Sequence, residues 1–395
     1  MFHLHDYIHG LMGQYFANKE MDELYVSIGI KALAQSLITI FIPIYLYKLG
    51  LSISSIALYY LIFYLAVTFC MYFAMKLNHK LGLKKVLALG TIILIGYYYL
   101  LDLLSKGVIH YSIVAIVLGI SMAVYYASFH IYFTKFSDKK HEALEVSIIR
   151  SLFRFSAVIG PIIGALLITG GSYKLAFIIV SILLIISIIP LFVTKDKKIK
   201  KQNITFQKVL RADSKKKAMA YVASGAIAIS AWILWPLFIF LNVEKLISLG
   251  FIISIGSLIT IFFLFIIGKT ADKNKEKVLK AGVYTHSITW PLRLFFLSPV
   301  GIFIMNLLST ITILMIDLPF SKYIYDQGRK SKNIANYFLF REFNLELGRM
   351  LVLIPVILTG EIYWAFIISF FATFAYLGLL KGKISPLDSF LPEED

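Results

Sequence analysis

The chain has 395 residues, of which 59% are hydrophobic and 15% are charged, and its mean hydropathy is +0.81. A soluble chain of this length would be about a quarter charged, so the composition excludes an ordinary soluble protein and indicates an integral membrane protein. The net charge of +17 is concentrated in loops between apolar runs, which argues against a nucleic-acid partner.

Residues 1–23 lack the continuous apolar core of a cleavable signal peptide. We expect an amphipathic lead-in on the cytoplasmic membrane surface. Its histidines at positions 3, 5 and 9 share no helical face, so no metal site is predicted there. The single cysteine, Cys70, falls in an apolar run and excludes an intramolecular disulfide.

Twelve apolar runs follow the lead-in, each long enough to cross a bilayer core of about 30 Å. They lie at 24–48, 53–76, 84–104, 108–134, 146–169, 172–194, 217–241, 247–268, 278–298, 300–325, 335–359 and 362–380. Runs of this length without strict alternation predict helices rather than the strands of a barrel. The fold class is therefore an all-α membrane protein with twelve transmembrane helices.

Basic residues gather in the loops that follow the even-numbered runs, whereas the loops after odd-numbered runs carry few. This bias places both termini in the cytoplasm of a multi-pass plasma-membrane protein. A basic linker, 195–216, separates a six-helix bundle at 24–194 from a second at 217–380, and 381–395 form a cytoplasmic tail.

The two halves resemble each other in the loops after runs two and eight, "MKLNHKLGLKKVL" at 75–87 and "GKTADKNKEKVL" at 268–279. A repeat of six runs with the same topology is a parallel duplication, whose axis runs along the membrane normal. The second copy carries Gly268 and the acidic–basic pair Asp272 and Lys273. The first copy carries Lys80 and Gly82, but His79 stands at the position of Asp272.

The fifth run carries a second motif, Gly160-Pro161-Ile162-Ile163-Gly164. Together with the twelve runs and the paired loops, it resembles the major facilitator superfamily over residues 24–380. The resemblance implies two pseudo-symmetric bundles that open a midplane site alternately to each side. In that family the Gly-Pro-x-x-Gly motif is reported mainly in exporters that exchange substrate for protons.

Each motif has a physical interpretation. Asp272 can bind helix N-termini or a neighbouring basic residue and so latch one conformation, while Gly268 permits close helix approach. Gly160 and Gly164 are expected to let helices pack tightly across the moving interface, and Pro161 is expected to bend its helix. The alternative is that these residues are ordinary packing and turn devices.

Apart from those at the ends of the runs, which are counted with the loops, five basic residues fall within the runs, where an unpaired charge costs from about 3 kcal/mol upward. Arg293 lies near the outer end of its run and Arg341 near the cytoplasmic end, so both are expected to snorkel to water. Lys31 is ambiguous, and the remaining two are Arg154 and Arg349.

Glu342, Glu346 and Arg349 are spaced i, i+4 and i+7, which places them on one stripe of a helix. That stripe must face protein or water, and Asp317 in the tenth run lies at a comparable depth. We predict one cluster of these four residues. An acid that alternates between dry and wet surroundings there would carry a proton; the alternative is a static ion-pair network.

Other polar and aromatic residues are candidates for a substrate cavity. They are Gln35, His130, Arg154, Tyr126, Trp232, Trp235 and Asn306. Pro236, directly after Trp235, is expected to kink the seventh run and to act as a hinge.

The sequence thus predicts a secondary active transporter for a small molecule, with alternating access and proton-coupled export by antiport. The alternatives are a nutrient uniporter or symporter, and a non-transporting receptor or scaffold, which the degenerate first-half loop favours. An enzyme is not predicted, because no nucleophile–histidine arrangement or metal-ligand spacing accompanies the acids. No cofactor is expected; the expected partners are the solute, protons and membrane lipids, for a monomer.

Overall fold

A computed structural model of the chain describes residues 19–137, 142–196, 215–331 and 333–380, and within these residues the chain is helical with no strand. Most of the predicted lead-in, most of the basic linker and the tail at 381–395 lie outside the described residues. The all-α fold class predicted from the sequence is confirmed.

The first half contains a helical segment for each of the first six runs. They are α2 (Lys19–Ser36) with η1 (Thr39–Phe41) and α3 (Ile42–Lys48), then α4 (Ile53–Leu81), α5 (Leu83–Ser105), α6 (Tyr111–Phe136), α7 (Glu142–Gly170), and α8 (Tyr173–Ile188) with η2 (Ile189–Phe192). Helix α2 begins at Lys19, inside the range predicted for the lead-in.

The second half repeats this organisation. Its elements are α10 (Lys215–Ile229), η3 (Ser230–Leu234) and α11 (Trp235–Val243), then α12 (Leu246–Lys273), α13 (Lys275–Leu292), α14 (Pro299–Lys330), α15 (Ile334–Thr359), and α16 (Tyr363–Thr373) with η4 (Phe374–Leu379). Among the described residues, nine helical segments are long and apolar enough to cross a membrane. Twelve crossings stay a prediction, since α13, α15 and the α16–η4 segment fall outside that group.

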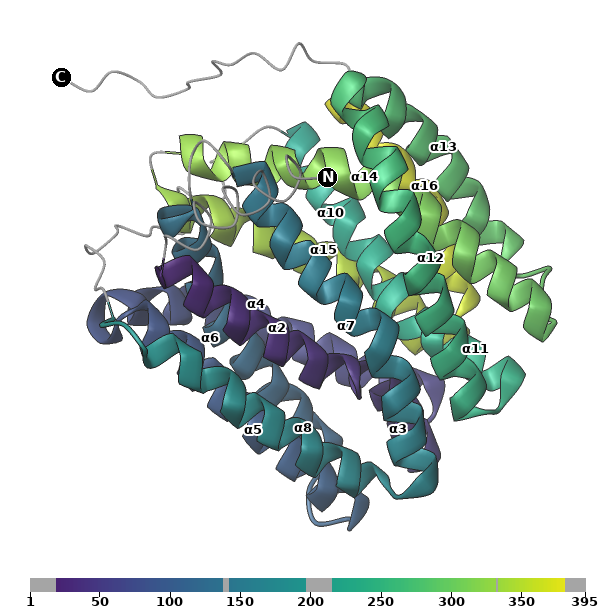
Figure 1. Cartoon of the computed structure of the whole chain (residues 1–395). Coiled ribbons are helices and arrows are strands. Elements are labelled where there is room, and N and C mark those ends of the chain that lie inside the picture. The colour runs from purple at the N-terminus through teal and green to yellow at the C-terminus, as the bar shows by residue number, and fades with distance from the viewer. Residues whose placement is uncertain (1–18, 138–141, 197–214, 332, 381–395) are drawn as a thin grey trace, which may run out of the picture.

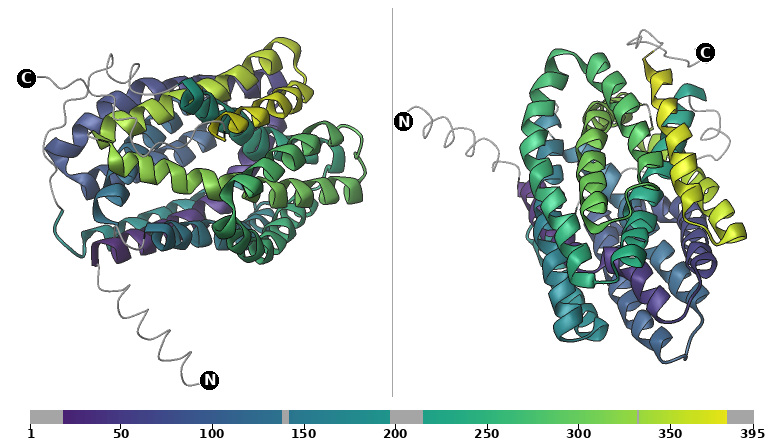
Figure 2. Two further views of the ribbon diagram at one scale, coloured as in Figure 1. Left: turned by 90° about the horizontal axis from the view of Figure 1, so that it is seen from above. Right: turned by 90° about the vertical axis from the view of Figure 1, so that its right-hand side faces the viewer.

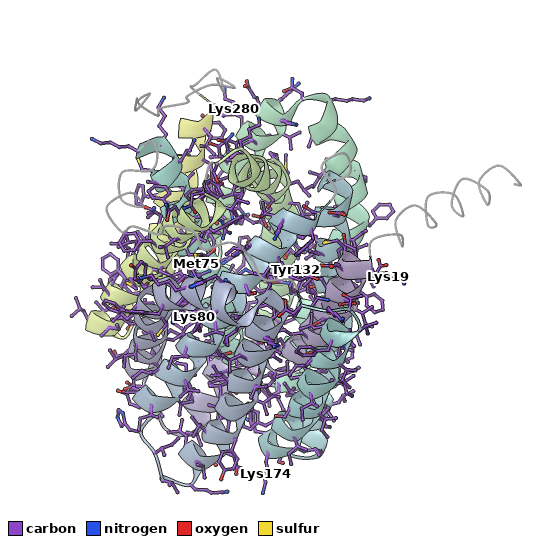
Figure 3. All side chains as sticks on the ribbon, turned by 90° about the vertical axis from the view of Figure 1, so that its left-hand side faces the viewer. Lys19, Met75, Lys80, Tyr132, Lys174 and Lys280 are labelled. Atoms are coloured by element: carbon purple, nitrogen blue, oxygen red, sulfur yellow. The ribbon has the colours of Figure 1, made fainter. Side chains whose placement is uncertain are left out.

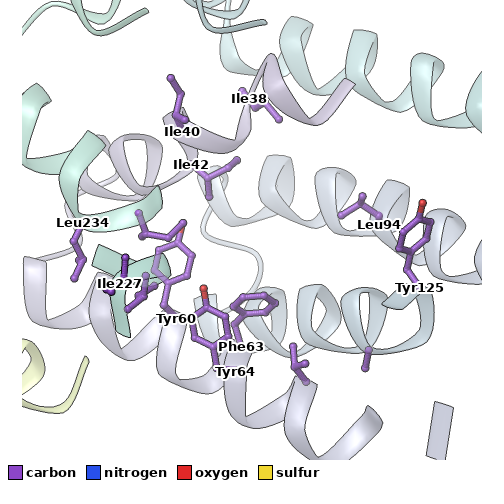
Figure 4. Close-up of a cluster of buried hydrophobic side chains, with 14 of the residues drawn as sticks. Ile38, Ile40, Ile42, Tyr60, Phe63, Tyr64, Leu94, Tyr125, Ile227 and Leu234 are labelled. Carbon is purple, nitrogen blue, oxygen red and sulfur yellow. The ribbon is translucent and has the colours of Figure 1, made fainter. Parts of the chain in front are cut away.

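The two halves form two helical bundles that lie side by side (Figure 1). Figure 2 gives two further views, in which helices of the two halves overlap. The principal contacts between the halves are α4 with α15 and α7 with α12. Elsewhere between the halves, Tyr60 and Tyr64 of α4 lie near Ile227 of α10 and Leu234 of η3 within one buried cluster (Figure 4).

The ends of the helices follow local sequence signals. Ser52, Ser172 and Ser298 each accept a backbone N–H three residues ahead and so cap the starts of α4, α8 and α14. In Figure 3, Lys280 of α13 lies at one end of the molecule and Lys174 of α8 at the other, with Lys80 and Lys19 between them. We call the side with Lys280, Lys80 and Lys19, opposite Lys174, the basic end.

The seventh run is interrupted where the sequence predicts a kink. A π-helical turn, η3, joins α10 to α11, and Pro236 occupies the first turn of α11. Proline has no backbone N–H and cannot bond the carbonyl four residues earlier, so the regular α-helical ladder ends here. The interruption sets the direction of Trp235, a predicted cavity residue.

The Gly-Pro-x-x-Gly motif lies differently from the prediction. A Cβ added to Gly160 would lie 1.9 Å from the Ser36 hydroxyl, and one on Gly164 would lie 1.8 Å from the Leu37 carbonyl oxygen. Both glycines therefore pack α7 against the first run of the same half, not across the junction between halves. The residue of the motif that approaches the other half is Pro161. Its carbonyl oxygen would lie 2.7 Å from a Cβ added to Gly250 of α12.

Candidate functional site

The candidate site lies where α15 packs between the two halves. Glu342 and Glu346 are 7% and 2% exposed, so the acidic stripe faces protein as its spacing predicts. Leucines occupy the other face, and Leu351 and Leu358 are exposed. The helix is thus amphipathic in the sense a membrane requires, with carboxylates inward and aliphatic side chains outward.

Glu346 and Arg349 form an ion pair one turn apart, with 2.6 Å between Arg349 Nη1 and Glu346 Oε1. The guanidinium also lies 4.9 Å from the ring centre of Tyr64 on α4, so the pair touches the other half of the molecule. Glu346 Oε2 is buried without a hydrogen-bond partner among the described residues. A cleft beside the pair is lined by Thr68 and Met71 of α4 together with both stripe carboxylates.

Glu342 makes a second contact between the halves. Its Oε1 lies 3.3 Å from His130 Nε2 on α6, and Arg341 bonds the same carboxylate. The His130 ring stacks on Phe338, with centroids 4.6 Å apart and planes 6° from parallel. His130, a cavity candidate in the sequence, is therefore packed into the junction with α15.

Asp317 does not join this cluster, so the predicted set of four residues is divided in the structure. Its charged neighbours are Arg150 and Arg154 of α7, in the first half. Arg150 also hydrogen-bonds Ser321, four residues beyond Asp317 on α14. The face of α14 that carries Asp317 and Ser321 is thus turned toward α7 rather than toward α15.

The first run contributes a buried lysine. Lys31 is 5% exposed, and its ammonium lies 2.8 Å from the ring centre of Tyr125 on α6. No salt bridge joins it to an acid of the described residues. Gln35, one turn further along α2, and Tyr126, the neighbour of Tyr125, are partly buried.

The other cavity candidates lie apart from the junction. Trp235 Nε1 donates to Asn306 Oδ1 at 3.1 Å, and Asn306 donates to the Ile252 carbonyl, so both belong to the interior of the second bundle. Trp232 is 59% exposed. Arg293 was expected to snorkel to water, and this is wrong, because it is 1% exposed within the same interior.

The structure of the two loop motifs also differs from what the sequence predicts. The backbone N–H groups of Lys84 and Lys85 donate to Asp196 at 3.1 Å each, so this residue supplies the acid that His79 does not. Gly82, with φ +100°, leaves the space that Asp196 occupies. Lys84 is fully buried and pairs with Glu23 of α2. The sequence held no signal for either partner.

The second-half copy of the loop is more open than predicted. A Cβ on Gly268 would meet no atom within 4 Å, so the expected close helix approach at this glycine is wrong. Lys273 and, in the first copy, Lys80 are exposed. The side chain of Asp272 lies outside the described part of the chain. Among the described residues, no group of three His, Cys, Asp or Glu could hold a metal ion.

Comparisons with known proteins agree with this architecture. The family model described as Major Facilitator Superfamily matches residues 24–326. The human organic anion transporter MFSD10 (TETRAN) has a similar solved structure, with a TM-score of 0.62 and 11% sequence identity, over 90% of this chain and 99% of that one. A search of curated proteins finds no match. At this identity the structural likeness concerns the fold alone.

Proposed function

Because the chain belongs to the Major Facilitator Superfamily, a family of membrane transporters, we propose that it exports a small solute in exchange for protons by alternating access. The observation that carries the proposal is the Glu346–Arg349 pair. It is buried at the junction between the halves, and one carboxylate oxygen has no partner within the described residues.

A buried carboxylate in this position is suited to bind and release a proton. Taking an ion pair out of water costs free energy that only good geometry and further hydrogen bonds recover. Glu346 has one bond to Arg349 and lacks a second. A change in hydration when the halves separate would therefore change the proton affinity of Glu346, and protonation would release Arg349 toward Tyr64 and water.

Two contacts at the basic end join the halves and would break during alternation. His130–Glu342 joins α6 to α15, and Asp317 with Arg150 joins α14 to α7. Both contacts cross from one half to the other, so both must break for the basic end to open. Alternation between this closed arrangement and one open at the basic end would expose the site to each side in turn.

An anionic solute fits the charges at the junction. Among the described residues, the two arginines on α7 face one acid, Asp317, and Lys31 of the first half is buried without an acidic partner. Positive charge in excess of the acids at this junction favours an anion such as a carboxylate as the solute. The proposed class of solute is the one named for the structural neighbour, which is described as an organic anion transporter; the support for it here is the charge at the junction.

The degenerate first-half loop had favoured a non-transporting scaffold. That argument loses weight, because Asp196 occupies the place of the missing acid and receives the two N–H groups at the start of α5. A uniporter or symporter would use the same junction without obligatory proton exchange.

Everted membrane vesicles with an acidic lumen test the proposal, with 5-carboxyfluorescein as the anionic probe. We expect pH-gradient-driven uptake, and dissipation of the gradient by the probe. Glu346→Gln should abolish both, whereas Glu361→Gln, at an exposed acid near the end of α15, should change neither. Uptake that ignores the gradient would exclude proton coupling, and gradient-driven uptake that survives Glu346→Gln would exclude this residue as the carrier.

A further inference from the structure

Arg293 is held in an aromatic cage inside the second bundle. It lies at the end of α13 and is 1% exposed. Its guanidinium carbon lies 3.9 Å from the ring centre of Trp290, 4.4 Å from that of Trp235 and 5.7 Å from that of Phe366. The three rings come from α13, α11 and α16, so the cage is closed by three helices.

The charge of this arginine has no counter-ion among the described residues. Ser309 of α14 accepts a hydrogen bond from Nη2, and no salt bridge reaches the guanidinium. Aromatic faces attract a cation and offset part of the cost of removing it from water. They do not satisfy its N–H groups, and a buried charge is ordinarily both paired and hydrogen-bonded.

Three donors in the cage are buried without an acceptor among the described residues. They are Nε and Nη1 of Arg293 and the indole Nε1 of Trp290, one turn earlier on α13. The indole of Trp235 is already engaged by Asn306. The Thr312 hydroxyl donates to the Leu308 carbonyl and therefore accepts from His286 Nδ1. In this neutral form His286 donates nothing into the cage, and its Nε2 is a buried acceptor without a partner among the described residues.

We propose that this cage is a binding site for a monovalent anion, with a halide as the species that fits best. An anion that accepts from Arg293 and Trp290 supplies the missing charge and the missing acceptor together. Three N–H donors among aromatic rings suit a small, weakly hydrated anion better than a doubly charged oxyanion. The site is separate from the junction between the halves and does not depend on the proposed proton exchange.

The Trp235 side of the cage lies next to a break in the regular helix, which allows this side to move and admit the ion. Trp235 directly follows the π-helical turn η3 and precedes Pro236. Turns of this kind recur at functional sites in helices. A small rotation of α11 about this point would move the Trp235 ring away from Arg293.

Anion titrations of the purified full-length protein test the site. Chloride replaces gluconate at constant ionic strength while intrinsic tryptophan fluorescence and the thermal unfolding midpoint are recorded. We expect both signals to change saturably, because two of the four tryptophans line the cage. Bromide should act like chloride. A saturable response to acetate and not to chloride would identify a carboxylate as the occupant, and no saturable response to any of these anions would overturn the proposal.

Variants test whether the chloride-dependent signals arise from binding in the cage. Arg293→Met should abolish it, and Trp290→Phe, which keeps a ring but removes one donor, should weaken the chloride affinity about tenfold. Lys245→Met removes an exposed charge just before α12 and should leave the affinity unchanged. If Arg293→Met does not fold, the test depends on Trp290→Phe, with the chloride dependence of its thermal unfolding midpoint as the measurement. An unchanged chloride dependence in a folded Arg293→Met or in Trp290→Phe would show that the ion binds elsewhere.

Discussion

The two members of the Glu346–Arg349 pair differ in their access to water, and this predicts an unequal response to their removal. The Glu346 side chain is 2% exposed and that of Arg349 is 23% exposed. Arg349→Met leaves a carboxylate enclosed by protein. Glu346→Met leaves a guanidinium that retains the Tyr64 ring beside it and belongs to a partly exposed side chain.

Stranding one member of a buried pair typically costs about 3–5 kcal/mol, and we expect Arg349→Met to fall in this range at pH 8. Glu346→Met should cost about 1 kcal/mol, because a partly exposed cation is stabilised by solvent. For a chain of this length 1 kcal/mol corresponds to about 1–2 °C in unfolding midpoint. Arg349→Met should therefore lower the midpoint by about 5 °C, and Glu346→Met by about 1–2 °C.

The double variant separates the pair interaction from simple truncation. Glu346→Met with Arg349→Met leaves no stranded charge, so its midpoint should lie close to that of Glu346→Met alone. At pH 5 the defect of Arg349→Met should shrink, because a neutral carboxyl needs no cation beside it. Thermal unfolding in one detergent at both pH values measures all four proteins. Equal losses in the two single variants, or a double variant no better than Arg349→Met, would refute the reasoning.

Three further outcomes follow from close contacts. Gly164→Ala should lower the unfolding midpoint by several degrees because its Cβ has no space, while Gly96→Ala, with nothing within 4 Å, should not lower it. Asp196→Ala removes the acceptor at the start of α5 and should cost about 1 kcal/mol, measured by the same unfolding assay. Cysteines at His130 and Glu342, in a protein lacking Cys70, should react with a short bifunctional thiol reagent and block probe uptake; uptake after complete cross-linking would mean that this junction does not open.

Much of the fold could be predicted because lipid imposes a strong pattern on sequence. Each apolar run had to be a helix, since no other open structure satisfies its backbone in hydrocarbon. The inward direction of Glu342 and Glu346 followed from the same constraint combined with helical spacing. These inferences needed only the period of the helix and the cost of burying charge.

The partner met by each polar face could not be predicted in the same way. Periodicity places Asp317 on a face of α14 but does not say which neighbour that face meets, and depth alone wrongly suggested α15. Arg293 lies near the end of its run, so snorkelling was plausible, yet the rotation of α13 directs it inward onto Trp290. Gly160 was assigned to the wrong junction for the same reason.

The two contacts at the basic end are related by the duplication of the chain. His130 belongs to the fourth predicted span of its half and meets α15, the fifth of the other. Asp317 belongs to the fourth span of the second half and meets α7, the fifth of the first. The positions repeat but the chemistry does not, because one junction pairs a histidine with a glutamate and the other sets one acid against two arginines. If the halves part as proposed, the second junction leaves two arginines on α7 and one acid on α14 among the described residues, and this excess of positive charge is the reason for proposing an anionic solute.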